Sequence, residues 1–242
     1  MTLNPISNQQ ILIKMKTSKI IFISLISATA FLIVIAFVDI KINSHRHKDT
    51  TVNRQILPSF KVIYISNCNF DLMQNDSSFI ETTCLKDSPM PGLDYSMKGD
   101  TLMVSDKSQS HKKDGFPTVR ISATDSLKSL ILKNSDITIK CFKVEKMNLN
   151  MNNSSVWLNQ DKKIISSFRS LDILAKNHSS IYSNEFKIEN LSINLQKSEV
   201  NLEIITNKIN GTLSDSSRVS IRQALEISLK TDSTSKAVVN DY

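Results

Sequence analysis

An apolar position recurs at a nearly constant separation through the C-terminal half of the chain. The residues that carry the repeat are Ile137, Val156, Ile181, Val200, Val219 and Val238. Successive members lie 19, 25, 19, 19 and 19 residues apart. A fixed period near 20 residues is typical of repeat architectures, in which each unit stacks on its neighbours.

Each repeat contains two short segments of alternating apolar and polar residues with a polar turn between them. In the first repeat, Leu130 and Leu132 precede Asn134-Ser135-Asp136, and Ile137 and Ile139 follow. A period of two is typical of half-buried strands. Parallel stacking at about 4.8 Å per layer would bury a continuous apolar column and leave Ser and Asn ladders on the turns. The sequence therefore predicts an all-β fold, a single-stranded parallel β-solenoid of about 19 residues per rung over residues 125–242.

Two details of this prediction stay open at the sequence level. The 25-residue step is expected to be one rung with a six-residue insertion that loops out within residues 160–169. A stack of antiparallel hairpins is the alternative fold, because residues 130–139 alone have the pattern strand, turn, strand. The two folds differ in whether Val200 and Val219 share a face.

The same motif occurs once before the repeat, as Ile63-x-Ile65 and Phe70-x-Leu72, at an irregular distance. Around it we expect strands at 78–82, 100–104 and 118–123, with loops at 87–93 and 107–117. A solenoid needs a cap at its end, because an open end exposes unpaired strand edges. We therefore interpret residues 59–124 as an irregular N-terminal β cap.

Residues 20–38 carry no charge and are flanked by Lys19 and Asp39. A helix of this length spans roughly 28 Å, which matches the hydrocarbon core of a bilayer. The pattern predicts a transmembrane helix between a cytoplasmic tail at 1–19 and a juxtamembrane linker at 39–58. The β domain, 59–242, is then expected in the periplasm or at the cell surface.

Processing of this segment has alternatives. A cleaved signal peptide needs a small-x-small site after its apolar core, and none follows Val38. A lipoprotein needs a cysteine there, and the first cysteine is Cys68. An uncleaved signal-anchor is therefore favoured, with Met15 as an alternative start to Met1.

Charge and cysteine content restrict the partners. The net charge of +7 is diffuse, and its densest cluster, residues 45–48, is interpreted as a solvated linker or a contact to anionic head groups. No aromatic platform accompanies the basic residues, so nucleic acid is not expected as a partner. Cys68 and Cys84 could pair if the cap brings them together, or all three cysteines are reduced, with Cys141 expected as a buried thiol.

No catalytic constellation is recognisable. The turn positions that cluster carboxylates in β-helix lyases are mixed in this chain: Asp136, Ser155, Ser180, Glu199 and Arg218. The sequence therefore predicts a protein that is not an enzyme, with no catalytic, cofactor-binding or metal-ligating residues. Candidate partner-binding residues are Trp157, Tyr182 and Phe186. Trp157 alternates between Val156 and Leu158, so it is expected to point away from the core.

Four segments carry a resemblance to a known family. They are residues 60–72, 94–104 (Asp-Tyr-Ser-Met-Lys-Gly-Asp-Thr-Leu-Met-Val), 117–121 and 127–137. In this order they resemble the auto-transporter adhesin head GIN domain family, the domain of unknown function 2807, from Phe60 to the C-terminus. The resemblance implies an exported protein of a type common in Bacteroidetes, with a β-solenoid behind an irregular N-terminal sheet. Family rungs usually turn at Ser-Gly-Ala-Ser, whereas this chain uses Asn-Ser-Asp or Lys-Ser-Glu, and no catalytic residue is implied.

Two functions follow from these expectations. The first is a membrane-anchored module of the cell envelope that binds an unidentified envelope protein or glycan. The alternative is a structural or regulatory accessory subunit of an envelope complex, with no ligand of its own.

Overall fold

The computed structural model describes residues 22, 24–35, 50–86, 93–106, 118–159, 167–184 and 186–239. The chain divides into two units, Met1–Asp49 and Thr50–Tyr242. In the first unit, residues 24–35 are helical, and the predicted membrane segment at 20–38 lies partly outside the described residues. Among the described residues, no helix combines the length and the apolar character needed to cross a membrane.

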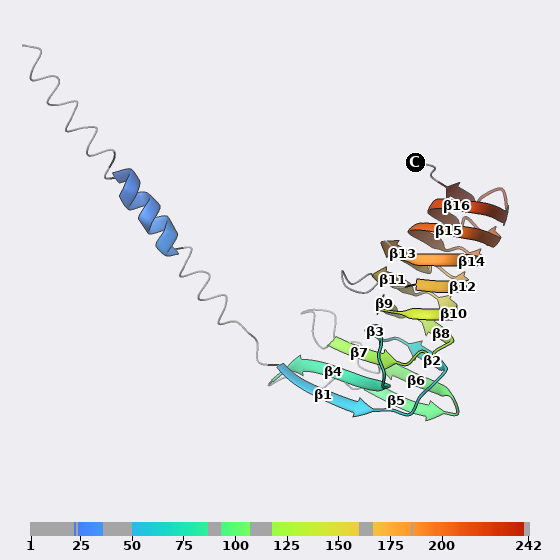
Figure 1. The fold of residues 1–242 in the computed structure, drawn as a ribbon, viewed down its shortest axis with the longest axis horizontal. Coiled ribbons are helices and arrows are strands. Elements are labelled where there is room, and N and C mark those ends of the chain that lie inside the picture. Colours follow the sequence, from blue (N-terminus) through green and yellow to red (C-terminus); the bar gives the residue numbers. More distant parts are fainter. Residues whose placement is uncertain are drawn as a thin grey trace, which may run out of the picture. The chain divides into compact units, whose positions relative to one another are not determined.

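The second unit is built from strands, and the expectation of an all-β solenoid is confirmed, with about five turns (Figure 1). The strands of the described residues are β1 Thr50–Ile56, β2 Val62–Ser66, β3 Phe70–Gln74, β4 Phe79–Leu85, β5 Leu93–Lys98, β6 Thr101–Asp106, β7 Thr118–Ala123, β8 Ser129–Lys133, β9 Asp136–Lys140, β10 Lys143–Asn152, β11 Ser155–Asn159, β12 Ser167–Lys176, β13 Ser180–Asn184, β14 Lys187–Gln196, β15 Glu199–Ser214, β16 Arg218–Thr231 and β17 Lys236–Val239.

The repeated apolar positions lie above one another in parallel register. Val156 pairs with Ile137 on one side and with Ile181 on the other. Ile181 pairs with Val200, and Val200 pairs with Val219. All five side chains are buried. The hairpin alternative is therefore wrong, because Val200 and Val219 occupy the same face of parallel neighbours.

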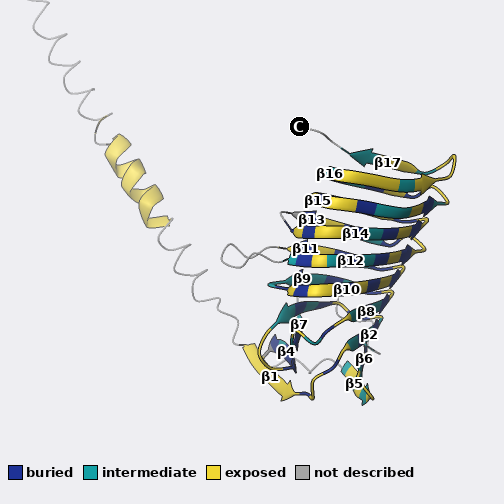
Figure 2. Cartoon of the chain, turned by 45° about the vertical axis from the view of Figure 1, so that its right-hand side comes forward, coloured by how far each residue is buried: buried dark blue, intermediate teal, exposed yellow. Residues whose placement is uncertain are grey.

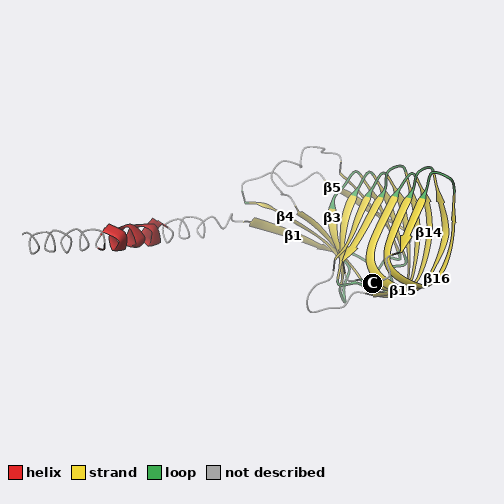
Figure 3. Cartoon of the chain, turned by 90° about the horizontal axis from the view of Figure 1, so that it is seen from above, coloured by secondary structure: helices red, strands yellow, loops and turns green. Residues whose placement is uncertain are grey.

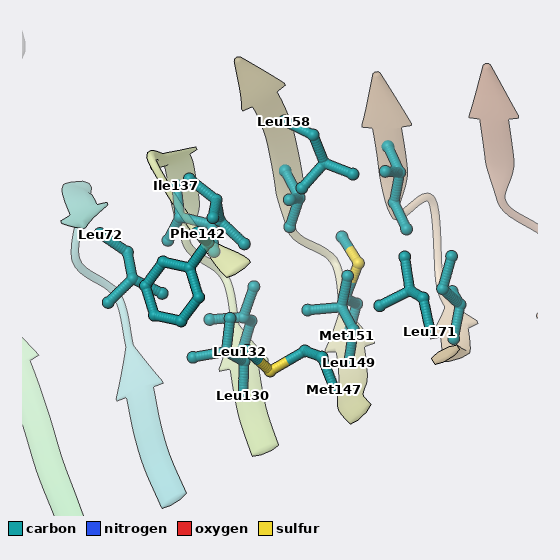
Figure 4. Close-up of a cluster of buried hydrophobic side chains, with 14 of the residues drawn as sticks. Leu72, Leu130, Leu132, Ile137, Phe142, Met147, Leu149, Met151, Leu158 and Leu171 are labelled. Carbon is teal, nitrogen blue, oxygen red and sulfur yellow. The ribbon is translucent and has the colours of Figure 1, made fainter. Parts of the chain in front are cut away.

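Two further strand systems complete each rung. β9, β11, β13, residues 199–203 of β15, residues 218–221 of β16, and β17 form one side, with β3 beneath β9. We call this side the short-strand face. The longer strands β10, β12 and β14 stack beside it and bury alternate residues (Figure 2). Figure 4 shows how their side chains fill the interior, with Leu130 and Leu132 of β8 next to Leu149 and Met151 of β10.

The turns between long and short strands hold the rungs in register. The first turn residue has a positive φ, and the polar residues Asn134, Asn153 and Lys197 occupy this position. Asn tolerates the left-handed region better than most residues do. In a row of the type seen in Figure 3, the turns follow one another along the solenoid.

A buried serine closes each of these turns. The hydroxyl of Ser154 donates to the Asn152 carbonyl at 2.9 Å and accepts the amide of Ser135 at 3.2 Å. The Ser154 amide in turn donates to the hydroxyl of Ser179 at 3.3 Å. The Asn153 side-chain amide donates to the Asn134 side chain at 3.0 Å. The predicted Ser and Asn ladders are therefore present, and they satisfy buried amides that the turns remove from the sheet.

Two turns contain an extra residue, which changes the expected spacing. The turns Asn177-His178-Ser179 and Asp215-Ser216-Ser217 each have two residues with positive φ. The 25-residue step is therefore divided: one added residue lies in the turn at 177–179, and the rest fall between β11 and β12, where residues 160–166 lie outside the described residues.

The position of the last anchor was predicted incorrectly. Val219 pairs with Ala237, and Val238 pairs with Ser220. The final step is therefore one residue shorter than the repeat suggested, which places Val238 out of the anchor column.

Regular stacking begins earlier than the repeat suggested. β2 pairs in parallel with β8, with Ile63 opposite Leu130, and β3 pairs with β9, with Phe70 opposite Ile137. On their other side β2 and β3 pair with β6 and β7. The isolated apolar motif at 63–72 is thus a rung of the solenoid, 67 residues before the rung above it.

Antiparallel strands extend this end of the sheet, as a cap requires. β5 pairs with β6, β4 with β7, and β1 with β4. The nearly buried Glu81 carboxylate of β4 accepts hydrogen bonds from Arg54 of β1 at 2.5 Å and Arg120 of β7 at 2.8 Å. β1 lies within the range 39–58 that the sequence predicts as linker. The predicted loops at 87–93 and 107–117 fall almost wholly outside the described residues.

Candidate functional site

Two aromatic side chains lie next to each other on the short-strand face. Trp157 of β11 pairs in register with Tyr182 of β13. Each residue is 37% exposed, and their ring centroids are 6.3 Å apart with an angle of 22° between the planes. Because the buried neighbours Val156 and Leu158 point inward, Trp157 points outward, as its alternation predicted. Parallel stacking brings together two residues that are 25 positions apart in the chain.

The third candidate, Phe186, lies in the core. It is only 2% exposed, and its ring packs against Phe168 with centroids 4.9 Å apart. Phe142 occupies the equivalent position one rung earlier, five residues after Ile137 as Phe186 is five after Ile181, and it is also buried. Both follow a corner between a short and a long strand, where the alternation of faces is interrupted. Phe186 therefore cannot contact a partner at this surface.

Uncharged polar residues surround the aromatic pair. Ser155 and Asn159 lie two positions before and after Trp157 on the same strand face, and Ser180 lies two before Tyr182. Thr138 is opposite Trp157 on β9, and Asn201 is opposite Tyr182 on β15. Between the described residues, the side chains of Ser155, Asn159 and Ser180 make no hydrogen bond that would occupy them. These groups are available to a ligand.

Charged residues begin one strand farther out. On β9, Lys140 forms an ion pair with Asp71 at 2.8 Å, and Asp136 lies on the same strand. On the other side, Glu199 and Glu203 lie on β15 and are exposed. The candidate site is therefore a small aromatic and polar patch between two charged strands.

A separate groove of about 1090 Å³ lies where β10, β12 and β14 begin. Its apolar floor includes Leu127 and Phe168. Arg169 on its wall contacts Glu145 at 3.3 Å and Glu189 at 3.8 Å, so the charged groups of neighbouring rungs neutralise one another. This groove has no aromatic side chain exposed in it.

The titratable groups of the described residues were searched for catalytic and metal-binding arrangements. They include no group of three or more His, Cys, Asp and Glu residues that could hold a metal ion. His178 lies in a turn, with φ of 64°, and its backbone amide donates to the Lys197 carbonyl at 2.7 Å. The remaining histidines, His45, His47 and His111, lie outside the described residues.

The three cysteines are free thiols, which excludes the Cys68–Cys84 disulfide and agrees with the reduced alternative. Burial, with a smaller effect of the Asp106 charge, raises the pKa of the Cys68 thiol to about 12. Cys141 differs from the expectation of a buried thiol. It adopts a φ of 56° at the corner after β9 and is half-buried, while the next residue, Phe142, fills the core.

Solved structures share this architecture at low sequence identity. A protein from Bacteroides fragilis NCTC 9343 named a "putative adhesin" matches with a TM-score of 0.52 and 11% identity, over 81% of this chain and 98% of that one. A "putative lipid binding protein" from Parabacteroides distasonis ATCC 8503 matches with a TM-score of 0.53 and 15% identity. A "putative adhesin" from the same organism has a TM-score of 0.52 and 12% identity. Both Parabacteroides proteins match over the same shares of the chains, 81% and 98%.

These likenesses define the class of protein as a β-solenoid of the fold found in proteins named as adhesins. No family model and no curated protein sequence matches the chain. Membership of the GIN domain family therefore stays a prediction, which rests on the segments quoted above.

Proposed function

We propose that this protein is a non-enzymatic binding module of the cell envelope, and that its short-strand face contacts a partner outside the cytoplasm. The observation that carries the proposal is the exposed, in-register pair of Trp157 and Tyr182. Aromatic side chains are enriched where proteins bind partners, because they offer a large contact area with few rotatable bonds. Two adjacent rings in water are more economically explained by a bound partner than by the stability of the solenoid.

The solenoid is well suited to hold such a contact in place. Both rings project from strands that are hydrogen-bonded on each side, and the buried Val156 and Ile181 fix the two strands from below. A preorganised surface loses little conformational freedom when it binds. The names of the similar solved structures support a binding role, although they extend to this chain only as a proposal.

Attachment to the membrane is the second part of the proposal. The uncharged stretch at 20–38 has the length that a membrane-spanning helix needs. Cell fractionation of the full chain and of a variant without residues 20–38 tests this part. The full chain is expected with the membranes, and the deletion variant in the soluble fraction. Equal distribution of the two proteins would contradict membrane attachment through this segment.

Binding of the full chain to envelope preparations of its own cells tests the binding role. Trp157→Ala should lower the amount bound at least about tenfold, because the larger ring of the pair is lost. Tyr64→Ala is the matched control, since Tyr64 lies on β2, outside the short-strand face, and is half-exposed. Unchanged binding by Trp157→Ala would contradict the proposed surface. Equal loss in both variants would indicate a general effect on folding.

A further inference from the structure

We infer that the partner of the short-strand face is a neutral glycan. This inference rests on the proposed binding function and specifies its ligand class. The geometry that supports it is a pattern repeated on two consecutive rungs. Ser155-x-Trp157-x-Asn159 on β11 lies in register with Ser180-x-Tyr182-x-Asn184 on β13, Ser opposite Ser, ring opposite ring and Asn opposite Asn.

A sugar ring has the two chemical features that this pattern complements. Its C–H faces are apolar and pack on aromatic rings, whose faces carry partial negative charge. Its hydroxyl groups both donate and accept hydrogen bonds, as the hydroxyls of Ser155 and Ser180 and the amide of Asn159 do. Within the described residues these three side chains have no other hydrogen-bond partner. The nearly parallel planes of the two aromatic rings, at 22°, allow adjacent sugar units to pack against Trp157 and Tyr182.

The size of the apolar patch favours a glycan over a protein. Trp157 and Tyr182 are the large hydrophobic residues that are exposed on the short-strand face, as far as its residues are described. A stable protein interface buries about 800 Å² on each partner and has a desolvated apolar centre. Two rings bordered by Ser, Thr and Asn make a smaller and more polar centre than this.

The surrounding charges favour a neutral ligand over an acidic one. Glu199 and Glu203 are exposed on β15, the strand next to Tyr182, and neither forms an ion pair with another described residue. On the other side the charge of Lys140 is offset by Asp71. A ligand carboxylate near Tyr182 would therefore meet like charges that are repulsive at short range.

The chain supplies its own reporter for a binding test, because Trp157 is its single tryptophan. The full chain, kept in a detergent without a sugar head group, is titrated with neutral oligomers of glucose, mannose, galactose and N-acetylglucosamine. Emission from Trp157 should shift and saturate with at least one neutral series. A galacturonate oligomer should bind at least about fivefold more weakly, and Glu199→Gln with Glu203→Gln should reduce that difference.

Variants that keep the reporter separate stacking from hydrogen bonding. Tyr182→Ala should weaken glycan binding at least about tenfold, and Asn159→Ala about threefold. Tyr64→Ala should leave the affinity unchanged. Circular dichroism of each variant shows whether the solenoid is retained, and a variant that has lost it is replaced by Tyr182→Leu.

The possible results distinguish the two proposals. If no neutral glycan changes the emission of Trp157 while envelope binding still depends on Trp157, the glycan inference fails and the binding function stands. If envelope binding does not depend on Trp157 either, both fail. Tighter binding of the galacturonate oligomer than of every neutral series would overturn the preference for a neutral ligand.

Discussion

Replacement of Gly211 by alanine should destabilise the C-terminal rungs strongly. Gly211 lies within β15 in a column of inward-facing positions, between Ile193 of β14 and Leu229 of β16. Its φ of 138° is a conformation that residues with a side chain rarely adopt. A Cβ at this position would lie 1.7 Å from the Ile193 carbonyl oxygen, so the two strands would have to move apart.

The magnitude follows from two costs. The backbone conformation costs on the order of 1–3 kcal/mol for a non-glycine residue, and an additional methyl group in a packed interior costs about 1–3 kcal/mol. Together they predict a loss of about 2–6 kcal/mol in the free energy of unfolding. Gly99→Ala is the control: its φ is 58°, but no atom lies within 4 Å of the added Cβ. That variant should lose about 1–2 kcal/mol.

Urea unfolding followed by far-ultraviolet circular dichroism measures both variants. Hydrogen exchange then locates the effect, because a solenoid rung contacts only its neighbours. Amides of β15 and β16 should exchange faster in Gly211→Ala, whereas those of β8 and β9 should change little. Equal destabilisation by the two substitutions, or faster exchange confined to β8 and β9, would refute the stacking of Gly211 against Ile193.

Three other predictions concern the turns and thiols. Ser154→Ala should cost about 1–3 kcal/mol in urea unfolding, because a buried amide and a buried carbonyl lose their partner; a loss below about 0.5 kcal/mol would contradict the serine ladder. Hydrogen bonds, the largest effect from Ser235, lower the pKa of Asp232 to about 2, so the β16–β17 turn should keep their stabilisation above about pH 4 and lose it as the pH falls through 2; a carboxyl NMR titration with a midpoint near 4 would contradict this. At pH 8 a thiol reagent should modify the half-exposed Cys141 in the native protein and spare the buried Cys68, whose pKa is about 12; fast modification of Cys68 would contradict its burial.

The repeat predicted the regular part of the fold because stacking imposes a local, periodic requirement. Val156, Ile181, Val200 and Val219 each need an apolar neighbour above and below, so the period is visible in the sequence. The outward orientation of Trp157 followed from the same alternation. The turns were also recognisable, since left-handed positions favour Asn and polar residues.

The remaining features depend on information that a period does not contain. An extra residue in the turn at 177–179 shifts the inward positions of β12 to Ile173 and Ala175, and a polar turn of three residues looks like one of two. The pairing of β2 with β8 joins segments 67 residues apart and has no periodic signal. The burial of Phe186 could have been recognised from Phe142, which occupies the same position relative to its anchor.

The contact between Trp157 and Tyr182 tests the central claim most directly, because only parallel rungs bring these two rings together. In a deuterated protein with protonated tryptophan and tyrosine, the single indole should show a nuclear Overhauser cross-peak to one tyrosine ring, and Tyr182→Leu should remove it. A cross-peak that survives Tyr182→Leu, or none in the unsubstituted protein, would contradict both the stacking and the site built on it.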